Sequence, residues 1–93
     1  MHAIIVEVDV SGADRETALQ RLREEVVPRV SSLPGFQSGT WLRPREDAKG
    51  FSLMLFDSEE NARTAAEAVQ VGSEPQPGVK VLRSELREVA VQA

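Results

Sequence analysis

Carboxylates are the side chains of this chain best placed for proton-transfer chemistry. The sequence has no cysteine and no tyrosine, so a thiolate nucleophile and a phenol acid are excluded. Glu7 and Asp9 alternate with Ile5 in an apolar, β-branched segment, which places both carboxylates on one face of a strand. Because apolar surroundings raise a carboxyl pKa toward neutrality, we predict Glu7 and Asp9 as catalytic bases. The alternative is a structural ion pair with Arg83 or Arg87.

Three large apolar residues supply the candidate binding surface for a substrate: Trp41, Met54 and Phe56. Trp41 can stack on a planar ligand, and Met54 and Phe56 alternate on one strand face and can line a pocket. The alternative for Trp41 is packing in the core or at an interface. For Met54 and Phe56, burial against a partner sheet explains both without a ligand.

No metal or cofactor site is predicted. The only histidine, His2, stands at what should be a frayed chain start and has no companions with metal-ligand spacing. Gly35, Gly39 and Gly50 do not follow the strand–glycine loop–helix order of a phosphate-binding loop. Any oxidation would therefore run without a cofactor.

The elements that position these residues alternate between two periodicities. Period-two patterns predict strands at residues 3–10, 36–42, 51–56 and 79–91. The first helix is predicted from an apolar stripe that recurs at steps of three or four, formed by Leu19, Leu22, Val26, Val30 and Leu33. Pro28 should kink this helix rather than end it, because it only deletes the bond to the carbonyl of Glu24.

The second helix is predicted to begin at Asp57, where Asp57 and Glu60 resemble a capping box. Its inner stripe consists of small side chains, which permit close approach to a sheet: Ala62, Ala65, Ala66 and Val69. Asn61 is expected to be an ordinary first-turn residue.

The resulting β-α-β-β-α-β order predicts one α+β domain over residues 1–93. Right-handed crossovers make it ferredoxin-like, a four-stranded antiparallel sheet with two helices on one face. Strand 51–56 is apolar on both faces, so a second sheet should cover the bare face. We therefore predict a homodimer. Strand 79–91 would extend roughly 40 Å, more than its own sheet needs, so its end should pair with the partner.

Several short motifs, in order along nearly the whole chain, resemble the antibiotic-biosynthesis-monooxygenase-like group of dimeric α+β barrel proteins. These are Leu33-Pro34-Gly35-Phe36, Trp41-Leu42-Arg43, Gly50-Phe51-Ser52-Leu53, the run from Phe56 to Ala62, Glu85, and Glu88-Val89-Ala90. The resemblance implies a homodimer whose bare sheet faces meet in a barrel. It also implies a small-molecule site in a cleft between each sheet and its helices or loops.

The group contains oxygenases for aromatic polyketides, haem-degrading enzymes and quinol-processing enzymes. Haem-degrading members use an Asn, a Trp and an iron-ligating His on the second helix, whereas here the only histidine is His2. Polyketide-oxidising members rely on tyrosines, which this sequence lacks. The resemblance therefore predicts the fold more specifically than the reaction.

The charge and the hydrophobic pattern of the chain argue against nucleic acid and membrane as partners. With 11 basic and 15 acidic residues the net charge is −4, and the scattered basic residues give no clustered positive face for nucleic acid. No segment reads as a signal peptide or membrane span, so a cytoplasmic location is expected.

The leading hypothesis for function is a homodimer that oxidises a planar aromatic or quinone-like molecule without a cofactor. A non-catalytic dimer that binds a hydrophobic small molecule, or serves in a stress response, is the main alternative. A haem-binding protein is the third.

Overall fold

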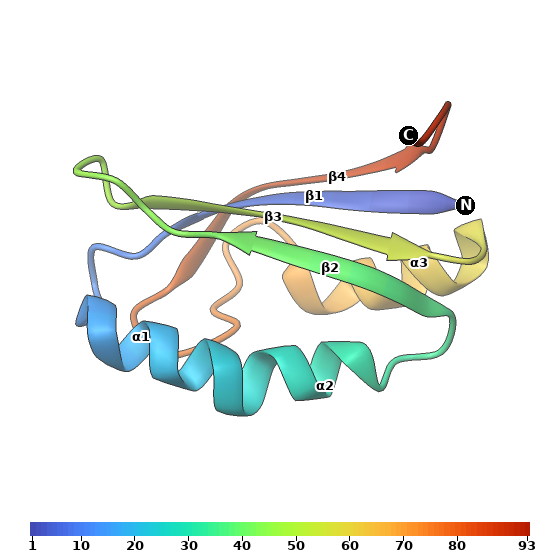
Figure 1. Cartoon of the computed structure of the whole chain (residues 1–93). Helices are drawn as coiled ribbons and strands as arrows, with labels where there is room; N and C mark the ends of the chain where they lie inside the picture. The colour runs from blue at the N-terminus through green and yellow to red at the C-terminus, as the bar shows by residue number, and fades with distance from the viewer.

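Segments of alternating apolar residues form a four-stranded antiparallel sheet in the computed structural model, which describes residues 1–93 (Figure 1). The strands are β1 (His2–Asp9), β2 (Phe36–Leu42), β3 (Lys49–Phe56) and β4 (Lys80–Glu88). Their order across the sheet is β2-β3-β1-β4. The two apolar strands β1 and β3 are therefore central, and the predicted ferredoxin-like arrangement is confirmed.

Two helical segments lie on one side of this sheet (Figure 1). The first comprises α1 (Arg15–Arg21), a π-helical turn η1 (Leu22–Val26) and α2 (Val27–Ser31) in direct succession. The second is α3 (Glu59–Ala66), followed by the 3₁₀ turn η2 (Glu67–Val69). None of these helices has both the length and the apolar character needed to span a membrane.

Pro28 lies just after the wide turn in the middle of the first helical segment. Proline has no amide hydrogen to donate to the carbonyl four residues back, and just before it the Val27 amide donates to the carbonyl of Leu22, five residues back. The helix continues through Pro28 to Ser31. The prediction that Pro28 does not end the helix is thus confirmed, and the kink stays a prediction.

Polar side chains cap both helical segments at their N-termini. Asp14 accepts a hydrogen bond from the Thr17 amide at 3.0 Å, and Ser58 accepts one from the Asn61 amide at 3.1 Å. The predicted cap at Asp57 is wrong by one residue, because the Ser58 hydroxyl is the group that reaches the free amide. Asp57 instead accepts a hydrogen bond from the Asn61 side chain at 2.9 Å.

The tightest part of the core lies between α3 and the sheet. Ile4, Phe56 and Ala62 are completely buried there, and the Phe36 and Phe56 rings meet edge to face with centroids 5.9 Å apart. Ala62 and Ala65 carry only a methyl group each, so the helix backbone comes close to the strands. The small-residue stripe therefore has the structural role that was predicted for it.

The opposite face of the sheet carries no helix (Figure 1). Phe51 and Leu53 of β3 and Leu42 of β2 point to this side and are 37%, 43% and 58% exposed. The register places Ile5 next to Leu53 and Glu7 next to Phe51 on the same face. We call this surface the open face.

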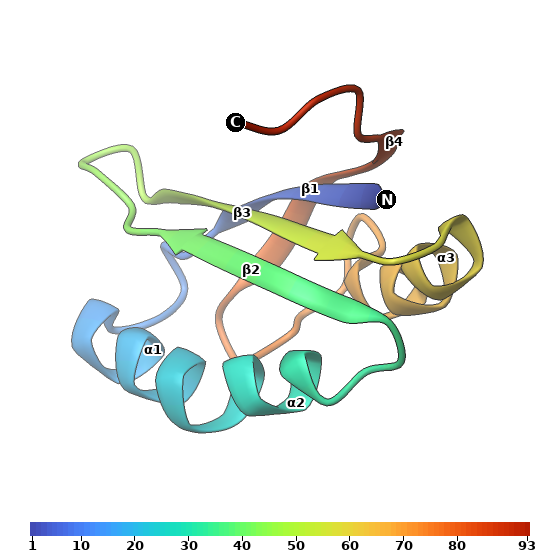
Figure 2. The same cartoon turned by 45° about the vertical axis from the view of Figure 1, so that its right-hand side comes forward.

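The last strand is shorter than its sequence pattern suggests. β4 ends at Glu88, whereas residues 79–91 were predicted to be extended. The final pairing is the Val89 amide, which donates to the carbonyl of Met1 at 2.9 Å, because β1 begins at His2 and offers no further partner. Residues 90–93 leave the sheet and curve over the open face (Figure 2).

Gly35, in the turn before β2, provides a test of the close packing at the start of α3. Gly35 has φ +78°, and a Cβ there would overlap the Asp57 and Asn61 side chains. Gly72 has a similar φ of +90° but no heavy atom within 4 Å of an added Cβ. Gly72→Ala should cost about 1 kcal/mol for left-handed backbone, and Gly35→Ala about 1–3 kcal/mol more for overpacking. Urea denaturation of both variants measures the difference; equal losses would contradict the packing at Gly35.

Candidate functional site

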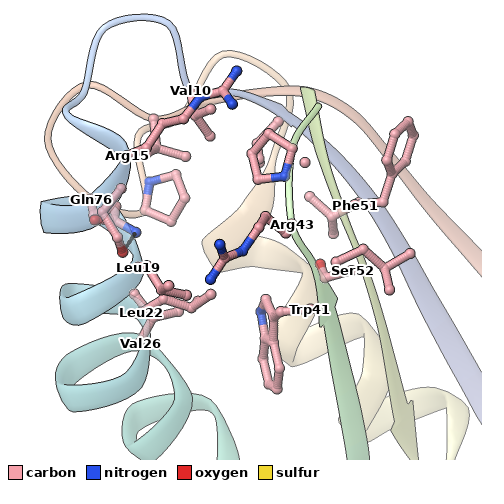
Figure 3. Close-up of a pocket in the computed structure, with 18 of the residues that line it drawn as sticks. Val10, Arg15, Leu19, Leu22, Val26, Trp41, Arg43, Phe51, Ser52 and Gln76 are labelled. Atoms are coloured by element: carbon pink, nitrogen blue, oxygen red, sulfur yellow. Dashed lines mark hydrogen bonds between the residues drawn. The ribbon is translucent and has the colours of Figure 1, made fainter. Parts of the chain in front are cut away.

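A cavity of about 300 Å³ lies between the first helical segment and the sheet (Figure 3). It exists because this segment faces the sheet with long side chains rather than alanines. Leu19 and Leu22 are only half-buried, and Val26 is the single buried residue of η1. Most of the side chains around the cavity are apolar, as in sites for small organic ligands.

The floor of the cavity is the helix-facing side of the three strands nearest to it. Val6 and Val8 of β1, Trp41 of β2 and Met54 of β3 belong to it. These positions share one face of the sheet for two reasons. Trp41 is paired with Ser52, and Ser52 with Val6. Val8 and Met54 are each two residues from a member of this row, and residues two apart on a strand point to the same side.

Besides the first helical segment and the sheet floor, the loop that connects η2 to β4 forms a third side of the cavity. This loop is tied to the first helical segment. The Gln76 side-chain amide donates to the carbonyl of Ala18 at 3.2 Å, and Arg29 donates to the carbonyl of Pro75 at 3.2 Å. At the loop's end Gly78 has φ +81° and approaches Gly12 so closely that a Cβ would overlap its carbonyl oxygen. The loop therefore needs glycine at 78.

One buried acceptor in this wall has no hydrogen-bond partner. The Ala18 carbonyl can only accept, so the atom of Gln76 that faces it must be the amide nitrogen. The side-chain oxygen Oε1 of Gln76 is left buried and unpaired. Buried polar atoms without a partner are rare in folded proteins.

Three charged residues line the cavity: Arg15, Glu16 and Arg43. Arg15 donates a hydrogen bond to the carbonyl of Arg45. Arg43 follows β2 directly and shares the helix-facing side with Trp41. In Figure 3 its guanidinium extends from the strand toward Leu22.

The structure brings together two of the three predicted binding residues. Trp41 and Met54 both line the cavity. Phe56 does not, because it lies at the other end of β3, where it packs against Phe36 in the tight core. This burial is intramolecular, so the partner-sheet alternative for Met54 and Phe56 is wrong: both point toward the helices of their own chain.

The two predicted bases are on the open face, away from the cavity. Glu7 lies 3.7 Å from Arg83, which also contacts Glu85 at 3.1 Å, and Arg87 contacts Glu85 at 2.6 Å. The ion-pair alternative for Glu7 is therefore observed. Hydrogen bonds from Ser11, through its side chain and its backbone amide, lower the pKa of Asp9, and nearby Lys49 lowers it further. Asp9 is thus held ionised, the opposite of the predicted effect of an apolar pocket.

His2 is ordered, contrary to the expected frayed start. It is the first residue of β1 and pairs with Phe56 and Glu88. Its Nε2 lies 4.0 Å from a carboxylate oxygen of Glu59, and its Nδ1 is buried without a hydrogen-bond partner. His2 does not line the cavity, and no cluster of three potential ligands capable of holding a metal ion occurs in the structure.

Sequence reasoning missed Arg43 and Gln76 as cavity residues. Arg43 had a usable signal, because it is two residues after Trp41 and strand alternation places both on one side. Gln76 had none, since the Ala18 carbonyl that orients it is 58 residues away in the chain.

Comparison with known proteins supports the fold and leaves the activity open. No family model matches the chain, and no curated protein matches it either. Among solved structures, the chain is similar to a single-site mutant of MhuD with two manganese protoporphyrin IX molecules bound per active site. The TM-score is 0.64 at 21% identity, covering 100% of this chain and 98% of that one. The chain therefore has the fold of MhuD over its whole length.

Proposed function

We propose that this protein binds a planar, mostly apolar small molecule in the cavity between α1–α2 and the sheet. The observation that carries the proposal is a cavity of about 300 Å³ lined mainly by apolar side chains, with Trp41 in its floor. This volume is at the lower end of the range for small-molecule sites. The fold shared with MhuD supports it, as does the sequence resemblance to the antibiotic-biosynthesis-monooxygenase-like group.

The side chains around the cavity do not fit a haem iron. Proteins hold haem iron through His, Cys, Tyr or Met side chains. Of these, only Met54 lines the cavity, and methionine ligation in cytochromes accompanies a histidine. His2 is outside the cavity. The proposed ligand is therefore a metal-free molecule.

Filling the cavity tests the binding proposal. Trp41 is the only tryptophan, so its fluorescence reports occupancy directly. Menadione, a planar naphthoquinone, should quench it saturably in the wild type. Ser52→Phe places a ring on the cavity floor beside Trp41, on a strand where aromatics are well tolerated. It should weaken menadione binding at least tenfold, about 1.4 kcal/mol.

Ser38→Phe is the matched control, since Ser38 is on the exposed side of β2 and pairs with Leu55. It introduces the same ring outside the cavity and should leave menadione affinity unchanged. Circular dichroism confirms that both variants fold. Unsaturable quenching in the wild type, or equal affinity in Ser52→Phe, would contradict ligand binding in this cavity.

Oxidation of a small molecule by molecular oxygen at the open face, on the opposite side of the sheet from the cavity, is the second candidate function. In such a reaction a methylene between aromatic rings loses a proton to a base and becomes a carbonyl; one oxygen atom of O₂ stays and the other leaves as water. The observation in its favour is Glu7, whose side chain is only 18% exposed and which is paired across β1 and β3 with Phe51. A partner sheet on the open face would enclose this carboxylate further.

Substitution of the two carboxylates tests this role. On any substrate that is oxidised, Glu7→Gln or Asp9→Asn should lower kcat at least a hundredfold if that carboxylate is the base. Because hydrogen bonds from Ser11 hold the pKa of Asp9 below its ordinary value, a reaction that uses Asp9 should keep its rate as the pH falls through the range in which an unperturbed aspartate takes up a proton. Wild-type turnover in both variants removes the mechanism.

We further propose that two copies of the chain associate through their open faces. Apolar side chains gather there without a covering layer: Ile5, Leu42, Phe51, Leu53 and Leu55. Figure 3 shows the ring of Phe51 directed away from the cavity. A second sheet packed about 10 Å away would bury these side chains, and a two-fold axis would present the same surface from both copies. Residues 89–93 would then lie against the partner.

A charge placed on the open face tests the dimer. Leu53→Glu should shift the protein to a folded monomer, because a buried unpaired carboxylate opposes association. Thr64→Glu, on the exposed surface of α3, adds the same charge elsewhere and should stay dimeric. Light scattering at low micromolar concentration distinguishes the two states. A wild-type chain that is a folded monomer under these conditions would refute the dimer.

A further inference from the structure

Arg43 is a charged side chain without a partner at the edge of a mostly apolar cavity. It lines the cavity together with Trp41, and its guanidinium extends from β2 toward Leu22 of the helical wall (Figure 3). It takes part in none of the ion pairs in the structure. Most other arginines have an oxygen to contact: Arg63 has Glu59, and Arg83 and Arg87 share Glu85.

The charge around the cavity differs in sign from that of the whole chain. Arg15 and Arg43 outnumber Glu16, the only carboxylate among the lining residues, so the net lining charge is +1, in a chain of net charge −4. Arg15 is held in place by its hydrogen bond to the Arg45 carbonyl. Since neither arginine forms an ion pair with Glu16, positive charge at this site is left uncompensated.

Gln76, which also lines the cavity, disfavours an anion next to its free atom. The free atom of Gln76 is the oxygen Oε1, which accepts hydrogen bonds and would repel an anion. An acidic ligand would therefore place its charged end near Arg43 and not near Gln76.

Carboxylate is the anion that this geometry favours. The planar fork of a guanidinium matches the two oxygens of a carboxylate, which it binds through parallel hydrogen bonds. Phosphate sites commonly use free backbone amides at a helix start. The start of α1 is already capped by the Asp14 carboxylate, which accepts from the Thr17 amide and hydroxyl.

We infer that the ligand of this cavity is a planar aromatic carboxylic acid, bound with its ring system against Trp41 and its carboxylate on Arg43. The inference rests on the proposed function, because it names the class of molecule that the same cavity binds. Arg43 then determines specificity, by selecting acids over neutral molecules of the same shape.

A matched pair of probes tests the inference on the full-length protein. 2-Naphthoic acid and 2-naphthamide have the same ring system and differ in charge at neutral pH. Isothermal titration calorimetry on the wild type should show the acid binding at least about fivefold more tightly, allowing for the solvent exposure of Arg43. Raising the salt concentration should reduce this preference.

Substitution of Arg43 assigns the preference to one side chain. Arg43→Gln should reduce the ratio of acid affinity to amide affinity to about one, and Arg43→Lys should keep part of the wild-type ratio, since lysine retains the charge without the fork. Arg23→Gln is the control: Arg23 is exposed, forms no ion pair and does not line the cavity, so both affinities should stay at wild-type values.

The outcomes separate the inference from the function on which it rests. Equal wild-type affinities for acid and amide, or a preference that persists in Arg43→Gln, would overturn the carboxylate inference and leave the cavity as a site for neutral molecules. Absence of heat with both probes, together with no quenching by menadione, would overturn the proposed function and the inference with it.

Discussion

The distance between each helical segment and the sheet is the constraint on which the rest of this structure depends. A helix can approach a sheet only as closely as its inward side chains allow. α3 presents Ala62 and Ala65, which are fully and almost fully buried against the strands. The first segment presents Leu19, Leu22 and Val26, so its backbone stays farther away and an apolar cavity remains beside it. One end of the domain is therefore a core and the other a candidate binding site.

The two faces of the sheet divide the two proposed tasks, ligand binding and self-association. Because side chains alternate along a strand, β3 sends Met54 toward the cavity and Leu53 toward the open face. A substitution on one face can thus change ligand binding without touching the dimer surface. The same alternation explains why the carboxylate of Glu7 and the ring of Trp41, both predicted to serve one site, are on opposite sides of a single sheet.

Local patterns predicted the fold because each element carried its own periodicity. The alternation of β1, the apolar stripe of the first helix and the small residues of α3 all appear in the structure as predicted. The predictions that were wrong concern the ends of strands and the surroundings of individual side chains. The last strand stops at Glu88 because its partner β1 offers no further pairing. His2 is ordered for the converse reason, since it pairs with strands on both sides.

The sequence alone determined which residues share a strand face and which share a helix face, because these periodicities are properties of the local backbone. Only the tertiary structure decided which face the helices cover, and hence that Glu7 and Asp9 face away from the cavity. It also brought Gln76 to Ala18 across 58 residues and left Arg43 without a counter-ion. Cavities and unpaired groups depend on the combined sizes and positions of side chains from several elements, which no local pattern contains.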